Sequence, residues 1–178
     1  MMWFRSHHFD RTGARLADDH YSRKTVGSPQ FMPPGRKLVL VLDAGVGRSA
    51  VFGVSWPYPE LVAHAWPNAW ICTIFRREPG CPYLASDLIV QAVAATRWKF
   101  GEPPKLGMVT WIQPKKVRPT MVHGRRVWGW TFLRAGFEPD HPTRGGHLTF
   151  RLPPARMPPP CRPQTAQLAL PFLQDLLP

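Results

Sequence analysis

Two adjacent side chains near the start of the chain, His20 and Tyr21, can do chemistry that an ordinary surface does not require. An imidazole titrates near neutral pH and binds metal ions, and a phenol donates or accepts a hydrogen bond or ligates a metal. The same pair also occurs as a purely structural contact. We therefore expect either a chemical site or a packed pair at the end of one or two helical turns over residues 14–20.

A second chemical feature is the basic segment over residues 114–126, which we expect to be an exposed loop. Tryptophans flank it on both sides. Cations beside aromatic faces are what the binding of an extruded nucleobase needs, and a solvated surface is the alternative interpretation. The predicted DNA-contacting side chains are Lys115, Lys116, Arg118, Arg125, Arg126, Trp128 and Trp130, with Trp111 or Trp130 available to stack on the base.

The third feature is the loop from Arg76 to Ser86, which leads into a predicted helix. Ser86 is expected to cap the exposed amides, and Asp87 suits the positive end of the helix. A helix N-terminus presents unpaired N–H groups, so it can bind the phosphate or carboxylate of a ligand. We predict contacts with such a ligand from Arg76, Arg77, Ser86 and Asp87, and the alternative is that the loop only connects.

These residues need elements to position them, and apolar patterns predict most of the elements. Residues 70–75 are typical of a central strand, a helix follows from Ser86 until Gly101 stops it, and residues 105–113 form the next strand. This order is a βαβ unit. The other predicted elements are a hairpin of strands 37–42 and 49–56, a short helix within 129–137, and a final strand at 147–152. We predict an α+β (α/β) fold with a central mixed sheet flanked by helices.

Composition narrows the class of protein. The 178 residues are 44% hydrophobic and include eight tryptophans, which suffices for one domain with a real core. Lysine and arginine outnumber the acids by 23 to 11, and the formal charge of +12 attracts polyanions such as DNA or RNA. Three widely spaced cysteines argue against a disulfide framework, and no stretch is long and apolar enough to cross a bilayer. We expect a soluble intracellular protein with no membrane partner.

The composition changes at Pro153, from which six prolines occur by residue 163. We predict a domain over 1–152, a stiff linker over 153–163 that cannot join a central sheet, and a tail over 164–178. The tail contains the run QLALPF, which resembles the short motif by which bacterial DNA-processing proteins dock on the replicative sliding clamp. Its key residues are Gln167, Leu168, Leu170 and Phe172. Alternatively, the tail packs back on the domain or forms a dimer contact.

The predicted order of elements resembles the GNAT acyltransferase fold. The hairpin, the strand-loop-helix-strand centre and the turn Ala135-Gly136-Phe137 carry this resemblance over residues 37–152. The resemblance implies that the loop and helix after the fourth strand hold the pyrophosphate of an acyl donor. The loop at residues 76–82 has one glycine and two prolines, so it departs from the glycine-rich loop of that fold.

A closer resemblance is to phage proteins of the Mom type, GNAT-like enzymes that modify adenine in DNA. The matching segments are, in chain order, His20-Tyr21-Ser22-Arg23, Pro34-Gly35-Arg36, Asn68-Ala69-Trp70, Phe75-Arg76, Ser86-Asp87-Leu88-Ile89, Gly107-Met108-Val109-Thr110-Trp111, Lys116-Val117-Arg118 and Ala135-Gly136-Phe137. The resemblance implies carbamoylmethylation of double-stranded DNA at adenine N6, iron as part of the site, and a phage- or prophage-encoded protein in a bacterial cytoplasm.

On this resemblance the metal candidates are His20 and Tyr21, and the catalytic candidates are His20, Tyr21, Ser22, Ser86 and Trp111. Family members carry an acid where this chain has Gln113, so either the metal site differs or Asp140 or His141 completes it. The donor is left open between an acyl-CoA, an aminoacyl-tRNA and another activated glycine-like molecule. Two other classes also stay open: a GNAT acyltransferase acting on a protein or small-molecule amine, and a non-catalytic DNA-binding accessory. The sequence does not decide whether the chain dimerises.

Overall fold

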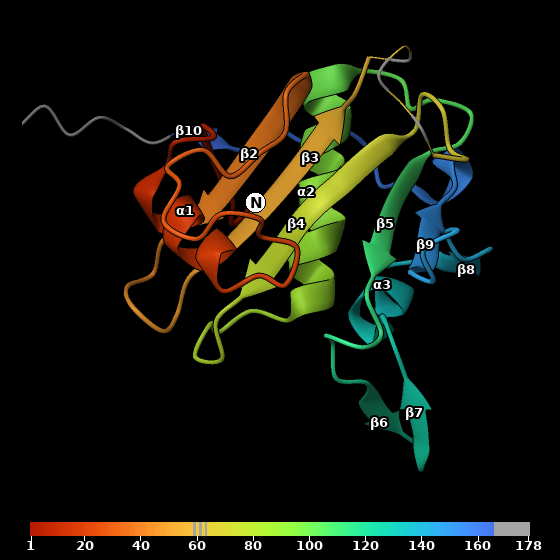
Figure 1. Ribbon diagram of the computed structural model, residues 1–178. Coiled ribbons are helices and arrows are strands. Elements are labelled where there is room, and N and C mark those ends of the chain that lie inside the picture. The colour runs from red at the N-terminus through yellow and green to blue at the C-terminus, as the bar shows by residue number, and fades with distance from the viewer. Residues whose placement is uncertain (59, 61, 63, 166–178) are drawn as a thin grey trace, which may run out of the picture.

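The protein is built on an eight-stranded mixed sheet in the order β10-β1-β2-β3-β4-β5-β9-β8, seen in a computed structural model that describes residues 1–58, 60, 62 and 64–165 (Figure 1). The strands of this sheet are β1 (Phe4–Ser6), β2 (Arg36–Leu42), β3 (Ala50–Trp56), β4 (Trp70–Arg77), β5 (Met108–Ile112), β8 (Glu138–Asp140), β9 (Leu148–Leu152) and β10 (Gln164–Thr165). The helices are α1 (Arg11–Asp18), α2 (Ala85–Phe100), α3 (Trp130–Arg134) and the 3-10 turn η2 (Pro154–Arg156). The predicted class, a mixed sheet flanked by helices, is confirmed.

Most of the predicted elements are present close to their expected bounds. Strands β2 and β3 form the predicted antiparallel hairpin, and β4, α2 and β5 form the predicted βαβ unit with β4 and β5 parallel. The strand predicted at 147–152 is β9, which pairs antiparallel with β5. No helix in the described part of the chain is long and apolar enough to cross a membrane.

Helix α2 covers one face of the sheet and lies behind it in Figure 1. Its residues Leu88, Ile89, Ala92 and Val93 are buried and recur at helical spacing, so one stripe of the helix packs on the central strands. The helix ends at Gly101, which has a φ of 85° and bonds back to the helix through its N–H. The stop predicted at this glycine is confirmed.

Helix α1 covers the opposite face over β2, β3 and β4. Asp10 caps it by accepting a hydrogen bond from the N–H of Gly13 at 2.7 Å. Its buried residues pack against the outer side of the central strands. The helical turns predicted over 14–20 thus belong to a helix that starts earlier and ends at Asp18, which leaves His20 and Tyr21 in the turn just after it.

Strand β4 is paired differently on its two sides. Towards β3 the ladder runs from Ile71 to Arg77, interrupted by one bulge at Thr73, which has no partner residue in β3. Towards β5 the ladder consists only of Trp70 with Met108 and Ile71 with Val109. Beyond these pairs the two strands diverge, and we call the space between residues 72–77 of β4 and 110–112 of β5 the β4–β5 wedge.

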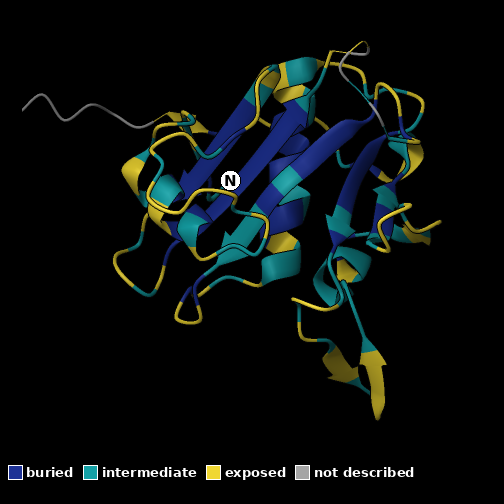
Figure 2. Cartoon of the chain, viewed as in Figure 1, coloured by how far each residue is buried: buried dark blue, intermediate teal, exposed yellow. Residues whose placement is uncertain are grey.

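The basic segment predicted as an exposed loop is exposed, but it is folded as a β-hairpin. Strands β6 (Thr120–Val122) and β7 (Arg125–Val127) form a separate two-stranded sheet that projects from the body, and most of its residues are exposed (Figure 2). His123 and Gly124 make the turn with φ values of 47° and 76°. Two successive residues with positive φ are typical of the turns that close tight hairpins.

The segment over 153–163 packs on the domain, and this corrects the prediction of a linker that leaves it. The N–H of Cys161 donates to the carbonyl of Ala94 on α2 at 3.1 Å, Pro163 is buried, and β10 pairs in parallel with β1. Proline removes only its own N–H donor, so a proline-rich segment can still pack along a helix and lead into a short edge strand that follows it, here Gln164–Thr165. The predicted clamp motif lies outside the described residues, which end at Thr165.

Candidate functional site

The β4–β5 wedge contains a cavity of about 140 Å³. Its walls come from the turn after α1, from β4 and β5, and from α3. The lining residues are His20, Tyr21, Cys72, Thr73, Ile74, Phe75, Thr110, Trp111, Ile112, Val117 and Phe132. The structure therefore brings three predicted catalytic residues, His20, Tyr21 and Trp111, to one cavity.

Tyr21 ties the turn after α1 to β5. Its hydroxyl donates to the carbonyl of Trp111 at 2.5 Å. Burial raises the pKa of Tyr21 to about 12, with a smaller contribution from the neighbouring Cys72, while the Gln113 backbone N–H acts in the opposite direction. A phenol that stays protonated and already donates its proton is suited to holding the cavity wall in place. It is poorly suited to accepting a proton at neutral pH.

His20 lies half-buried against Tyr21, with ring centroids 4.5 Å apart. Burial lowers the pKa of His20 to about 4, and the positive charge of Arg76 lowers it further. The imidazole is therefore neutral at pH 7, and it is able to accept a proton or to bind a metal ion.

The hydrogen bonds of Nδ1 decide which ring nitrogen of His20 carries the proton. The Ser22 backbone N–H lies 3.3 Å from Nδ1 and can only donate, which favours a proton on Nε2. The Ser22 hydroxyl lies 2.7 Å from Nδ1 and can either donate or accept. If it accepts, Nδ1 holds the proton and Nε2 becomes the free base. The two contacts of Ser22, a predicted catalytic residue, thus bear on which tautomer His20 adopts.

A second hollow of about 380 Å³ adjoins the wedge and shares His20 and Tyr21 with it. The other lining residues are Asp19, Phe75, Arg76, Arg77, Lys116, Val117 and Arg118. Four cations and one acid line this hollow, so its field favours an anion. Two predicted donor contacts and two predicted DNA contacts therefore meet beside the predicted catalytic pair.

Two of the three arginines of this hollow, Arg76 and Arg77, also hold loops in place. Arg76 donates to the carbonyl of Asp19 at 3.0 Å and pairs with its carboxylate at 3.3 Å. Arg77 donates to the carbonyl of Cys81 at 2.9 Å. Their charge contributes to the hollow, but only part of each guanidinium is free for a ligand.

Three backbone amides of the loop before α2 donate hydrogen bonds within the fold. The N–H groups of Glu78, Gly80 and Cys81 donate to carbonyls of Ser49, Gly47 and Glu78, at 2.9 to 3.1 Å. The buried carboxylate of Glu78 accepts from Arg15 at 2.6 Å and from the N–H of Ser49 at 2.8 Å, and these bonds lower the pKa of Glu78. Three amides of the loop are therefore unavailable to the pyrophosphate predicted to bind there.

Ser86 does not cap α2, and this prediction was wrong. The helix begins at Ala85, and its N-cap is Leu84, whose φ of −64° and ψ of 136° are extended. Ser86 already has helical geometry, and its hydroxyl lies 3.5 Å from Asp87. A capping side chain must sit on the last residue before the helix, where the backbone is not yet helical. Neither Ser86 nor Asp87 lines the two hollows around His20.

Trp111 connects the wedge to an aromatic cluster beside β5. Its ring lies 5.1 Å from His64 and 5.9 Å from Trp66, and Trp66 stacks on His141 at 4.5 Å. Asp140 accepts hydrogen bonds from the Trp66 indole and the Arg151 guanidinium, each at 3.1 Å. The indole N–H of Trp111 is buried and has no hydrogen-bond partner among the described residues. Such a donor is available to a ligand.

The other predicted stacking residues lie away from this cavity. Trp128 donates to the carbonyl of Val117 at 3.1 Å and lines a hollow on the side of β9. Trp130 lies beside Arg134, whose guanidinium carbon is 5.9 Å from the ring centre. Of the three predicted aromatic residues, only Trp111 contributes to the wedge.

The residues around His20 do not assemble a complete iron site. Within the described ranges, no three side chains of His, Cys, Asp or Glu converge as metal ligands. Asp140 and His141 bond to each other at 2.7 Å and belong to the cluster behind Trp111. Asp19, the acid nearest in sequence, pairs with Arg76. His20 and Tyr21 are thus two candidate ligands without a carboxylate partner, and no step is assigned to iron below.

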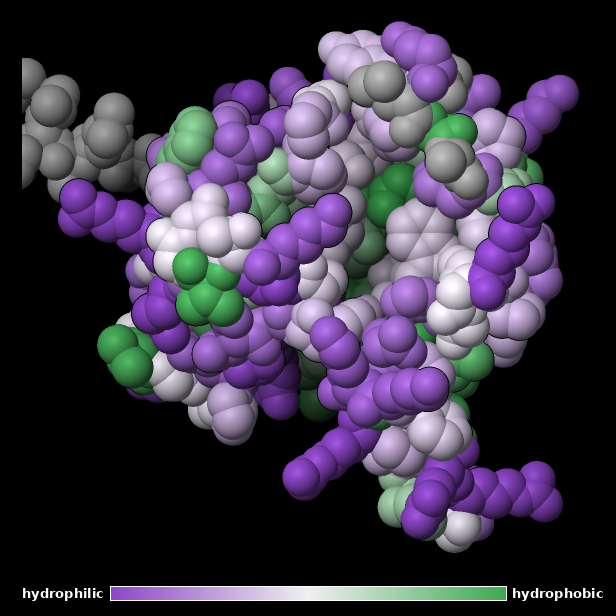
Figure 3. Space-filling model, viewed as in Figure 1, coloured by the Kyte–Doolittle hydropathy of each residue, from purple (hydrophilic) through white to green (hydrophobic). Residues whose placement is uncertain are grey.

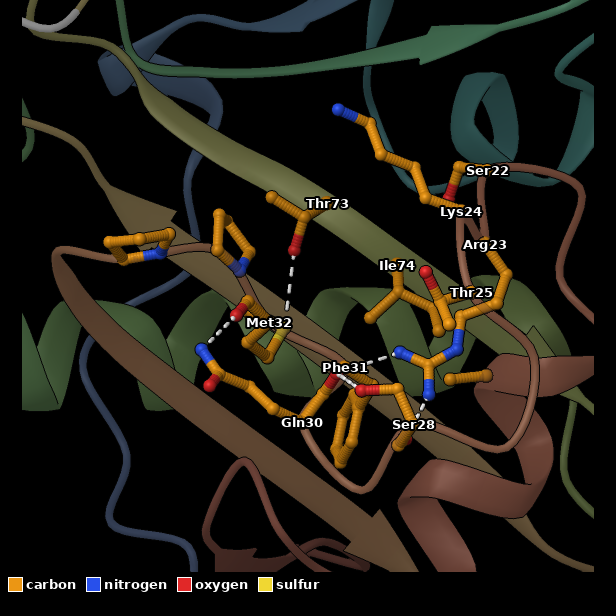
Figure 4. A pocket seen from close by; sticks show the side chains of 13 residues that line it. Ser22, Arg23, Lys24, Thr25, Ser28, Gln30, Phe31, Met32, Thr73 and Ile74 are labelled. Carbon is orange, nitrogen blue, oxygen red and sulfur yellow. Dashed lines mark hydrogen bonds between the residues drawn. The ribbon is translucent and has the colours of Figure 1, made fainter.

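Sequence reasoning missed a third hollow of about 420 Å³, formed where residues 22–34 fold over β4 (Figure 4). Arg23 lies on one side of it, and Thr73 and Met32 face each other on the other side, 3.3 Å apart. Arg23 pairs with Asp18 at 2.8 Å and is almost fully buried. Thr73 and Ile74 line both this hollow and the wedge. No local pattern signals such a site, because it depends on where an irregular segment crosses the sheet.

Comparisons of this chain with protein-family models, with curated proteins and with solved structures gave no match.

Proposed function

We propose that this chain is a transferase that adds a carbamoylmethyl group to the N6 amine of adenine in DNA. The observation that carries the proposal is the meeting of His20, Tyr21 and Trp111 in the β4–β5 wedge, beside a hollow lined by four cations. An unprotonated base, an aromatic face and a positive rim are the parts that a base-modifying site requires. The mixed sheet is compatible with the GNAT-like arrangement, which remains part of the proposal.

The proposed chemistry follows from the weak nucleophilicity of the target. The ring of adenine delocalises the lone pair of N6, so a base must take a proton as the new bond forms. The bond from N6 to the CH2 carbon of the carbamoylmethyl group forms, the leaving group that the donor carries on that CH2 departs with the electron pair of its bond, and the N6 proton passes to His20. Transfer to Nε2 needs the tautomer in which Nδ1–H donates to Ser22, and we assign Ser22 a positioning role.

The open side of β4 is where we place the donor. Thr73 lies in the bulge, and its neighbours in β4 have no strand partner on the β5 side among the described residues. Backbone N–H groups at such an edge can donate to the carbonyl oxygen of the carbamoyl group and so position the donor. Three amides of the loop before α2 are bonded within the fold, so fewer donors remain there for the pyrophosphate of an acyl-CoA.

We also propose that the tail docks on the replicative sliding clamp through its QLALPF motif. The described chain ends at β10, on the sheet edge opposite β8 and four strands away from β4. At an interstrand spacing of about 4.8 Å, the tail starts roughly 20 Å from the wedge. A docked tail therefore leaves the wedge free for DNA. A peptide of residues 164–178 should bind purified clamp, and Gln167→Ala with Phe172→Ala should abolish that binding without changing activity on naked DNA.

Mass spectrometry of nucleosides from cells expressing the protein tests the proposed function. We expect a deoxyadenosine carrying one carbamoylmethyl group with the wild type, and none with His20→Ala at equal protein levels. Unmodified DNA together with newly acylated protein or metabolite amines would point to the acyltransferase alternative. Unmodified DNA with intact DNA binding and no acylated product would point to an accessory protein.

A further inference from the structure

The β6–β7 hairpin is the part of the molecule that the proposed chemistry leaves unused. It forms its own sheet and projects beside the wedge (Figure 1). Its base is anchored, because the indole of Trp128 donates to the carbonyl of Val117 at 3.1 Å and so closes the ends of the hairpin. Val117 itself lines the wedge and the cationic hollow. The hairpin therefore has a fixed position relative to the proposed site.

One apolar side chain of the hairpin, that of Met121, is exposed to solvent. Met121 is 61% exposed, although methionine gains free energy from burial. Arg126 is its direct cross-strand partner, so the two side chains share one face of the ribbon. The partly covered Val122 and Val127 belong to the opposite face. The exposed face therefore presents one flexible apolar group beside a cation.

The charge around Met121 selects a polyanion as the partner. Lys115, Lys116 and Arg118 precede β6, Arg125 and Arg126 lie on β7, and all five are exposed. No acidic residue occurs between residues 114 and 127. Hydrophilic side chains dominate this end of the molecule (Figure 3). A two-stranded ribbon fits the major groove of B-DNA, which is about 12 Å wide and carries the N6 amine of adenine on its floor.

The reach of the hairpin matches that groove. Met121 lies four residues beyond Val117, which at about 3.3 Å per residue is roughly 13 Å from the rim of the site. The major groove is about 8.5 Å deep. A ribbon of this length brings Met121 to the stacked bases while the cationic hollow stays at the backbone. In complexes at the minor groove, flexible apolar side chains of this kind separate stacked bases. Here the same kind of side chain approaches the stack from the major groove, where the N6 amine lies.

We propose that the β6–β7 hairpin enters the major groove of double-stranded DNA and that Met121 inserts into the base stack, holding open the place of the adenine that turns into the wedge. The inference rests on the proposed function for the identity of the extruded base. Arg125 and Arg126 contact the phosphates that flank the insertion. Met121 is thus a positioning residue that acts on the duplex and takes no part in bond formation.

The test uses the full chain and mixed-sequence duplexes that carry 2-aminopurine in place of one adenine, whose fluorescence rises when the base unstacks. We expect the wild type to raise the fluorescence of a subset of duplexes. Met121→Ala should bind DNA within about threefold of the wild type yet lose most of this rise, by about fivefold or more, because insertion is what offsets the unstacking cost. Val46→Ala is the matched control, since Val46 is 89% exposed in the loop between β2 and β3.

The outcomes separate this inference from the proposed function, since the fluorescence needs no transfer chemistry. Loss of the rise in Met121→Ala, with recovery in Met121→Leu, supports insertion even where no modified nucleoside forms. A wild-type rise with Met121→Ala, or no rise in any duplex that the wild type binds, overturns it. Dissociation of a dimer in Met121→Ala, seen by sedimentation without a change in fluorescence, assigns the hairpin to self-association and also overturns it.

Discussion

The two edges of β4 differ in how far they are paired. Its β3 edge is paired from Ile71 to Arg77, and β3 contributes fully buried residues such as Val51 and Phe52 to both faces of the sheet. Its β5 edge is paired at two residues and then opens into the wedge. The candidate chemistry gathers on the open edge. The paired edge of β4 therefore contributes to stability and the open edge to the candidate site. Substitutions on the two sides should have separable effects on stability and on activity.

The largest effect is expected on the closed side. Phe52→Ala should lower the free energy of unfolding by about 3–5 kcal/mol, because a fully buried aromatic ring leaves a cavity between α2 and the sheet. Urea unfolding monitored by circular dichroism measures it. Val46→Ala, an exposed site on the loop that leads into β3, should stay within about 0.5 kcal/mol of the wild type. A cost below about 1 kcal/mol for Phe52→Ala would show that the closed edge does not hold the fold.

On the open side, His20→Ala should abolish most activity while sparing the fold. Loss of a general base typically costs about 10² to 10⁴ in rate. The urea midpoint should be unchanged, because His20 lies in a turn outside the sheet. Single-turnover modification of a DNA duplex gives the rate. A mutant with wild-type rate would remove His20 from the site.

The basic side chains beside the wedge, those of Lys115, Lys116 and Arg118, should set the salt dependence of DNA binding. Charge reversal of Lys115, Lys116 and Arg118 should lower the slope of log affinity against log salt by about 3, because each phosphate that is no longer neutralised removes roughly 0.9 from the slope. Lys99→Glu, an exposed charge near the end of α2, is the control. If the triple reversal and the control give equal slopes, these three basic residues belong to an ordinary surface.

How far the sequence predicted this molecule depends on whether each feature is local. The β4-α2-β5 unit and the β2–β3 hairpin follow from apolar periodicity and turn residues, and both are confirmed. The capping role of Ser86 was wrong, because several residues near Leu84 fit a helix start and only the backbone decides among them. The packing of residues 153–165 was missed, because a parallel partner as distant as β1 leaves no local signal.

The candidate site was predicted in part for the same reason. His20, Tyr21 and Trp111 were identified by residue type and by resemblance, and the fold brings them to one cavity. The wedge itself was not predicted, since its opening depends on how far two parallel strands stay paired. The positions of Trp128 and Trp130 depend on tertiary packing, such as that of Trp128 beside β9. A sequence pattern does not contain that information.

The pH dependence of activity should show that the pKa of His20 lies below the usual histidine value. The proposed transfer needs unprotonated His20, and burial followed by the charge of Arg76 lowers the pKa of His20 to about 4. The value of kcat/KM should therefore stay level from pH 7 to pH 5 and fall by half near pH 4, below the usual histidine range. Arg76→Gln should move the fall to higher pH. A half-loss near pH 6.5 in the wild type would mean that His20 titrates as an exposed residue.

The smallest effect is expected from Tyr21→Phe, which removes the hydroxyl that joins the turn after α1 to β5. The free energy of unfolding should fall by about 1 kcal/mol, the usual worth of one hydrogen bond. Activity should fall moderately, because the proton acceptor stays and only its support loosens. A loss as large as that of His20→Ala would instead give the phenol a direct chemical role.

The central claim, that adenine N6 reaches the β4–β5 wedge, is tested most directly by thiol crosslinking. A duplex whose target adenine carries on N6 a short arm that ends in an activated disulfide is incubated with Thr73→Cys or with Val46→Cys, so that the new cysteine forms its disulfide by thiol–disulfide exchange with release of the arm's thiol leaving group. Each variant also carries Cys161→Ser to remove the exposed native thiol. Burial raises the pKa of Cys72 in the wedge wall to about 12, so this native thiol stays unreactive. The account predicts disulfide formation at Thr73→Cys at least about tenfold faster than at Val46→Cys, because proximity raises the effective concentration. Equal rates at the two positions, or a faster reaction at Val46→Cys, would contradict it.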